Sequence, residues 1–208
     1  MEKLQQIIEN SKLTAETIEA NLMHPVLKTV DYKPREIFDE ITDISDNYFN
    51  STSAIRMIGL AGLRGVGKTT LLWQAADYIY KNYTKNIYFF HLGDLKNYNI
   101  GVRELHKGFE KYFANDKLWS YKEKIVLLFD EVHEDPSWAS DLKILYDLFL
   151  SAFVVATGSS ALLLQSTADL VTRMLIQHVY PLNFREYIGL THLNTKKITK
   201  IRQKLQDI

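Results

Sequence analysis

A glycine-rich stretch between two apolar segments constrains the fold of this chain more than any other feature. Residues 62–69 read Gly-Leu-Arg-Gly-Val-Gly-Lys-Thr and match the pattern G-x-x-x-x-G-K-[ST]. The apolar run before it, 54–61, predicts a buried strand, and residues 68–81 after it carry apolar side chains at helical spacing. Strand, glycine loop and helix are the context in which this pattern binds the phosphates of a nucleotide. The sequence therefore predicts a phosphate-binding loop in an α/β fold.

The chemistry of this loop assigns a role to each type of residue in it. Backbone N–H groups at the start of a helix bind anions, and glycines let the backbone turn tightly around a phosphate. Lys68 is expected to contact the β- and γ-phosphates of ATP, and the Thr69 hydroxyl to ligate Mg²⁺. Arg64 has two interpretations, contact with phosphate or exposure to solvent. The predicted ATP-binding residues are Gly62, Leu63, Arg64, Gly65, Val66, Gly67, Lys68, Thr69 and Thr70.

A second acidic motif supplies the remaining chemistry for nucleotide hydrolysis. The apolar run 125–129 predicts a buried strand that carries Asp130 to its carboxyl end, followed at once by Glu131. Asp130 is expected to hold Mg²⁺ through water, and Glu131 to act as the general base that activates the attacking water. A small-molecule kinase has little need of a base for water, so the pair favours a hydrolase.

The apolar strand predicted at 152–158 ends in a group of small polar residues. Ser159 is the leading candidate for contact with the γ-phosphate and the attacking water, with Thr157 and Ser160 next. Capping of the following helix by Ser159 or Ser160 is the alternative, and the two roles are compatible.

Composition and charge exclude several classes of protein. The length of 208 residues suits one α/β domain with a short extension, and hydrophobic residues make up 46% of the chain. Lys and Arg total 25 and Asp and Glu total 25, so no overall charge draws the core to nucleic acid. Cysteine is absent, which excludes disulfides and thiolate zinc sites. The histidines lack metal-ligand spacing, and without a signal peptide or membrane span we expect a cytoplasmic protein.

Strands and helices alternate along the chain, which predicts a parallel sheet covered by helices on both faces. The expected strands are 54–61, 86–92, 125–130, 152–158 and 174–180, and the expected helices 2–24, 34–49, 68–81, 101–119 and 137–150. We divide the chain into an N-terminal helical extension, 1–50, a nucleotide-binding core, 51–190, and a tail, 191–208. The tail is strongly basic. It is interpreted as a solvated helix, the start of a further C-terminal domain, or an extension that binds nucleic acid or a partner.

Four segments together resemble the AAA+ ATPases: 62–70, 128–133, 138–143 and 156–160. They are most similar to the prokaryotic AAA+ group that is often followed by a DUF4143 or nuclease-like C-terminal domain. Arg173 and the segment 180–187 echo two further signatures of that group, so the resemblance covers about residues 50–190. Arg173 is accordingly a candidate for completing a γ-phosphate site, in its own chain or a neighbouring one. A structural salt bridge is its alternative role.

The resemblance implies an αβα sandwich, a P-loop NTPase fold whose five-stranded parallel sheet has the order 5-1-4-3-2. It also implies Mg²⁺-dependent ATP binding and hydrolysis, coupled to conformational change or to assembly with itself or another protein. A slow-turnover signalling switch of the STAND type is one alternative, and an ATPase that assists DNA processing is another.

Overall fold

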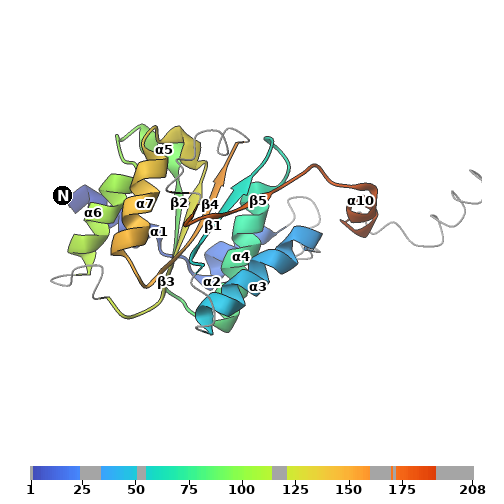
Figure 1. Ribbon diagram of the computed structural model, residues 1–208. Helices are drawn as coiled ribbons and strands as arrows, with labels where there is room; N and C mark the ends of the chain where they lie inside the picture. The colour runs from blue at the N-terminus through green and yellow to red at the C-terminus, as the bar shows by residue number, and fades with distance from the viewer. Residues whose placement is uncertain are drawn as a thin grey trace, which may run out of the picture.

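Parallel strands form the centre of the molecule (Figure 1). The computed structural model describes residues 2–23, 34–50, 55–113, 121–159, 170 and 172–190. Within these residues the sheet has five strands in the order β5-β1-β4-β3-β2, and every neighbouring pair is parallel. This is the order that the resemblance implies. The strands are β1 (Met57–Ala61), β2 (Ile87–His91), β3 (Ile125–Asp130), β4 (Ala152–Gly158) and β5 (Leu175–His178).

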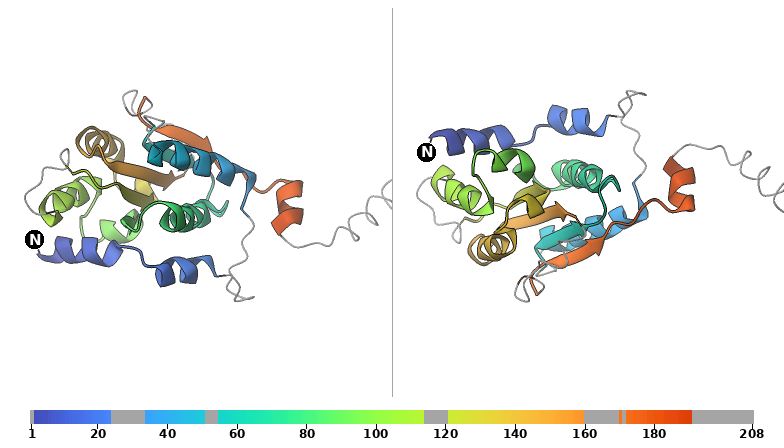
Figure 2. Two further views of the ribbon diagram at one scale, coloured as in Figure 1. Left: turned by 90° about the horizontal axis from the view of Figure 1, so that it is seen from below. Right: turned by 90° about the horizontal axis from the view of Figure 1, so that it is seen from above.

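Helices cover both faces because successive apolar residues of a strand point to opposite sides. In β3, Leu127 and Phe129 enter one hydrophobic core, while Val126 and Leu128 enter the other. The first core is closed by three helices, α1 (Glu2–Ser11), α6 (Val102–Tyr112) and α7 (Trp138–Leu148). The second is closed by α2 (Ala15–Leu22), α3 (Glu36–Phe49) and α4 (Lys68–Asn82). The two views of Figure 2 show the resulting αβα layers.

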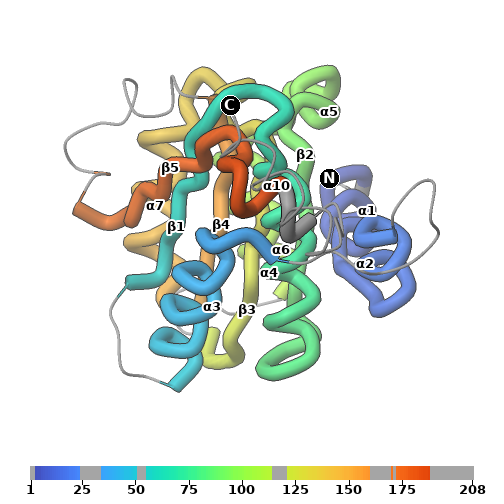
Figure 3. Tube along the Cα trace, turned by 90° about the vertical axis from the view of Figure 1, so that its right-hand side faces the viewer, coloured from blue at the N-terminus to red at the C-terminus, as the bar shows by residue number. Residues whose placement is uncertain are grey.

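The first two helices both lie beside the β2 edge of the sheet (Figure 3), and they pack into opposite cores. Between them, Lys12 forms an antiparallel bridge with Tyr88, and the Leu13 N–H donates to the Ile87 carbonyl at 2.8 Å. Ile8 of α1 and Ile18 of α2 are buried in opposite cores, at 0% and 1% exposure. The N-terminal helices therefore share the core of the sheet and pair part of its edge strand.

The structure departs from the expected elements mainly at short segments. Strand β2 ends at His91 because Leu92 already begins a helix, α5 (Leu92–Lys96). Helix α3 begins at Glu36 instead of Pro34, because Arg35 is extended, with φ −75° and ψ 160°. The 3₁₀ turn η2 (Val132–Glu134) and the helix α10 (Phe184–Leu190) were not expected. The tail at 191–208 lies outside the described residues, within which no helix has the length and apolarity needed to cross a bilayer.

Candidate nucleotide-binding site

The glycine loop connects β1 to α4 at the carboxyl edge of the sheet. Gly65 and Gly67 have φ of +83° and +93°, a left-handed region that other residues rarely adopt. Gly62 is required for a different reason, since a Cβ there would lie 2.3 Å from the Val179 carbonyl oxygen. Leu63 and Arg64 are exposed on the loop, while Thr70 is half-buried in the first turn of α4. The loop thus has the backbone geometry of a phosphate cradle.

Lys68 begins α4 and extends back across the loop. Its Nζ donates to the carbonyl oxygens of Gly62 and Leu63, at 2.8 Å each. Burial lowers the pKa of the Lys68 ammonium, and the charges of Asp130 and Glu131 partly offset this effect. Both acidic residues are thus close enough to influence the ammonium, and a phosphate oxygen could replace either carbonyl as its acceptor.

The two residues predicted to hold Mg²⁺ are in direct contact. The Thr69 Oγ1 donates to Asp130 Oδ2 at 2.8 Å, and Asp130 is only 2% exposed. A hydroxyl and a carboxylate are ligands that suit Mg²⁺, which usually takes one or two protein groups and completes its shell with water and phosphate oxygens. The described residues contain no cluster of three or more His, Cys, Asp or Glu that could hold a metal ion.

Thr157, at the end of β4, connects the two acidic residues from behind. Its hydroxyl donates to Asp130 Oδ1 and accepts the backbone N–H of Glu131 at 3.1 Å. Thr157 is fully buried, so its side chain faces the Asp130 carboxylate and the Glu131 backbone and not solvent. The sequence ranked Thr157 behind Ser159 and as a phosphate contact; the geometry places it beneath Asp130 instead.

Glu131 has a backbone conformation that is rare for its residue type. Its φ of +56° and ψ of 48° lie in the left-handed region, which costs energy for a residue with a Cβ. Such outliers cluster at functional sites, where the surrounding structure holds them. The Glu131 carboxylate lies at the end of β2, with its Oε2 3.5 Å from His91 Nε2.

His91 is a site residue that the sequence did not single out. It is the last residue of β2 and pairs in register with Asp130, the last residue of β3. Spacing between histidines carries no information about this contact, since the partner is a glutamate on a neighbouring strand. The available signal was position, because a polar residue that ends a parallel strand lies at the edge where ligands bind.

The three remaining candidates are Ser159, Ser160 and Arg173. Ser159 follows β4 directly and is half-buried at the carboxyl edge, where its N–H donates to His133 Nδ1 at 3.4 Å. Ser160 lies outside the described residues. Arg173 precedes β5 and so lies at the opposite, amino edge, where its Nε donates to Asp147 Oδ1 at 2.9 Å. A single chain therefore does not bring Arg173 to the glycine loop.

Comparison with known proteins agrees with this geometry. Residues 54–188 match a family model described as AAA domain. The uncharacterized protein MJ1637 of Methanocaldococcus jannaschii is 38% identical over 160 residues, which cover 76% of this chain and 33% of that protein. The uncharacterized protein MJ1544 of the same organism is 27% identical over 136 residues, covering 65% and 29% respectively. This chain thus spans about a third of the length of the curated relatives it matches.

A solved structure described as "Structural Basis for Katanin Self-Assembly" superposes with a TM-score of 0.54 at 16% identity, covering 85% of this chain and 59% of that one. At this identity the likeness shows the fold alone. The matched family model covers more than half of the chain, and it includes the glycine loop and the Asp130–Glu131 pair. This chain therefore belongs to the AAA domain family of P-loop ATPases.

Proposed function

We propose that this protein binds Mg-ATP at the glycine loop and hydrolyses it to ADP and phosphate. The observation that carries the proposal is the contact between Thr69 and Asp130, at 2.8 Å, directly beside Lys68 and Glu131. One contact thus joins the two halves of the motif, which stand far apart in sequence. The same edge of the sheet supplies a charge for phosphate, two oxygen ligands for a metal, and a carboxylate for water.

The reaction would use each group for a separate task. Lys68 and the loop N–H groups would hold the β- and γ-phosphates, and Thr69 and Asp130 would hold Mg²⁺, which neutralises charge on the phosphate oxygens. Glu131 would accept a proton from water while the oxygen of that water attacks the γ-phosphorus in line. The bond from that phosphorus to the bridging oxygen breaks, and ADP leaves with the electron pair. Before accepting the proton, the Glu131 carboxylate would turn from His91 toward the water.

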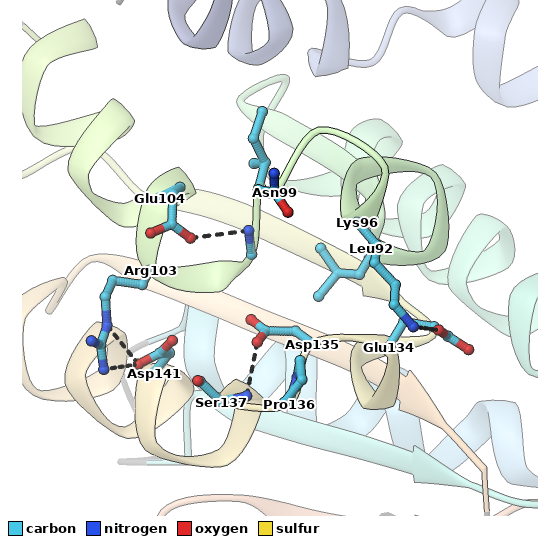
Figure 4. A pocket seen from close by; sticks show the side chains of 12 residues that line it. Leu92, Lys96, Asn99, Arg103, Glu104, Glu134, Asp135, Pro136, Ser137 and Asp141 are labelled. Atoms are coloured by element: carbon cyan, nitrogen blue, oxygen red, sulfur yellow. Dashed lines mark hydrogen bonds and ion pairs between the residues drawn. The ribbon is translucent and has the colours of Figure 1, made fainter.

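Contacts beyond Glu131 support coupling of this chemistry to conformational change. The turn η2 directly follows Glu131, and its Glu134 bonds Lys96 of α5 at 2.9 Å (Figure 4). The next residue, Asp135, accepts N–H groups of Val102, at the start of α6, and of Ser137. A change in the Glu131 turn would therefore move α5 and the start of α6. The same movement would also couple hydrolysis to assembly with further copies of this chain or with another protein.

Removal of the Lys68 ammonium tests ATP binding. We expect Lys68→Ala to weaken binding of Mg-ATP by more than about tenfold, because the phosphates lose a charged partner in a partly buried site. Isothermal titration with Mg-ATP measures this. Lys81→Ala is the matched control, since Lys81 lies on the same helix but is exposed and paired with Asp77. Equal affinity of Lys68→Ala and the parent protein would reject the assignment of the loop.

A further inference from the structure

The guanidinium of Arg35 joins three segments that are far apart in the sequence. Its Nη1 donates to the Val66 carbonyl in the glycine loop at 2.8 Å, and its Nη2 to the Tyr180 carbonyl after β5 at 2.9 Å. Its Nε and Nη2 also donate to the two carboxylate oxygens of Glu186 in α10, both at 3.0 Å. The Arg35 and Glu186 side chains are only 11% and 8% exposed. A bidentate pair of this kind fixes orientation as well as charge.

The bond to Val66 determines how the next N–H points. The peptide bond between Val66 and Gly67 is trans, so its C=O and N–H point in opposite directions. Because Arg35 holds the carbonyl, the Gly67 N–H is directed away from Arg35. Gly67 is the N-cap of α4, and N–H groups at a helix start are those that bind anions. Arg35 thus fixes the orientation of one of the amides expected to hold phosphate.

The bond from Arg35 to Glu186 holds the start of α10, because Glu186 is itself bonded to Asn183 just before the helix. The Glu186 carboxylate accepts the Asn183 N–H at 3.1 Å, and the Asn183 side chain accepts the Glu186 N–H at 2.9 Å, which closes the start of the helix. In Figure 1, α10 is set apart from the sheet, and its Phe184 and Tyr187 are 75% and 49% exposed. Because Phe184 and Tyr187 bury little surface, we expect the bonds between Glu186 and Arg35 to fix the position of the start of α10.

We propose that Arg35 is a positioning residue, which orients the Val66–Gly67 peptide for phosphate binding and, through Glu186, links nucleotide binding to the docking of α10. This inference rests on the proposed function of the loop. Coupling of two equilibria is reciprocal. Bound nucleotide therefore stabilises docked α10, and loss of the Arg35–Glu186 pair weakens nucleotide binding.

Three substitutions separate this role from a general effect on stability. Arg35→Lys keeps the positive charge but loses the planar fork that bonds a carboxylate and two carbonyls together. Glu186→Gln leaves Arg35 in place and removes the bidentate ion pair, because the amide keeps one oxygen to accept from Arg35 or from the Asn183 N–H. Arg185→Gln is the matched control, since Arg185 is the neighbouring residue of α10, 89% exposed and 4.0 Å from Glu36.

Amide hydrogen exchange of the full chain, with and without Mg-ADP, tests the inference together with a titration of Mg-ADP. In the parent protein, we expect Mg-ADP to slow exchange both in the loop, 65–70, and in α10. In Arg35→Lys, both segments should exchange faster without nucleotide, and Mg-ADP should no longer protect α10. The affinity for Mg-ADP should fall by a factor in the range of about 5–150 that is typical of coupled sites. Glu186→Gln should share these changes in part, and Arg185→Gln should share none.

Two outcomes would overturn the inference. The first is that Arg35→Lys exchanges its amides and binds Mg-ADP as the parent protein does. The second is that only α10 exchanges faster, while exchange in the loop and the affinity for Mg-ADP are unchanged, which would make the Arg35–Glu186 pair merely structural. Protection of the β3 amides from exchange reports whether each variant is folded. If Arg35→Lys does not fold, the results for Glu186→Gln decide whether the inference holds. If the parent protein binds no nucleotide, the proposed function fails, while the nucleotide-free comparison still decides whether Arg35 holds the loop and α10 together.

Discussion

The Thr157 hydroxyl shows how one buried residue can set the geometry of two acidic groups. It donates to Asp130 Oδ1, which leaves Asp130 Oδ2 facing Thr69, and it accepts the N–H of Glu131. The second bond helps to hold Glu131 in its left-handed conformation. Partners behind a metal-binding carboxylate typically change affinity or activity by about 10–100-fold when they are removed.

We therefore expect Thr157→Val, which has the same shape, to lower the turnover number for ATP by about 10–100-fold. Binding of ATP without Mg²⁺ should stay at the parental level, because the loop and Lys68 are untouched. Steady-state hydrolysis and titration in EDTA measure the two quantities. Thr157→Ser keeps the hydroxyl and should restore most of the activity. Parental turnover in Thr157→Val would show that the hydroxyl has no part in positioning the acids.

At the residue scale, local sequence motifs predict the roles of the residues within them, but they do not predict contacts between side chains on different strands and helices. The contact of Thr69 with Asp130 follows from a glycine loop and a strand end, each readable from nearby residues. The roles of His91 and Arg35 depend on partners on other strands and helices, Glu131 and Glu186. No spacing in the sequence encodes such pairs.

At the scale of elements, Asp135 joins the starts of two helices. Its Oδ2 accepts the Val102 N–H of α6 at 2.9 Å, and its Oδ1 accepts the Ser137 N–H before α7 at 2.8 Å. A Cβ on Gly101 would overlap the Asp135 carboxylate, so a larger residue there would have to displace it. The carboxylate caps free N–H groups that the helices cannot satisfy themselves.

Asp135→Ala should accordingly lower the free energy of unfolding by about 1–3 kcal/mol, since two N–H groups lose their acceptor. Urea denaturation followed by circular dichroism gives the value. Asp43→Ala, at an exposed position of α3, is the control and should change stability by less than about 0.5 kcal/mol. A loss no larger for Asp135 than for Asp43 would contradict the capping role.

The long, strongly patterned elements were predictable and the short ones were not. Strands β3 and β4 lie where the apolar runs predict, because central strands of a parallel sheet are buried on both faces. Strand β5 is shorter than expected, since among the described residues it pairs with β1 alone, and it is partly exposed along its length. The α5 and η2 segments form after strand ends, where tertiary contacts decide the local structure.

At the scale of the whole molecule, Arg173 and the glycine loop lie at opposite ends of the parallel strands. Arg173 precedes β5 and bonds Asp147 near the end of α7, whereas Asp130 ends β3 and Glu131 follows it, at the carboxyl edge of the sheet. A catalytic contribution from Arg173 would therefore require a second chain. Arginines delivered by a partner raise phosphate-release rates by about 10³–10⁵-fold in related GTPases.

We expect ATP hydrolysis per chain to rise with protein concentration, and a mixture of Lys68→Ala with Arg173→Ala to recover part of the activity that each lacks alone. In the mixture, an intact loop of one chain can meet an intact arginine of the other. Hydrolysis measured over a range of concentrations, and in equimolar mixtures, provides the test. If activity per chain does not change with concentration and the mixture is inactive, the role of Arg173 is structural, through its salt bridge to Asp147.

The most direct measurement of the central claim is single-turnover release of phosphate from Mg-ATP by the parent protein and by Glu131→Gln. The amide keeps the shape of the side chain but cannot accept the proton of water, while Lys68, Thr69 and Asp130 stay in place. We expect equal Mg-ATP affinity and a release rate at least about 100-fold lower in the variant. Release at the parental rate by Glu131→Gln, with ATP bound equally well, would contradict the assignment of Glu131 as the base and of this edge of the sheet as the hydrolytic site.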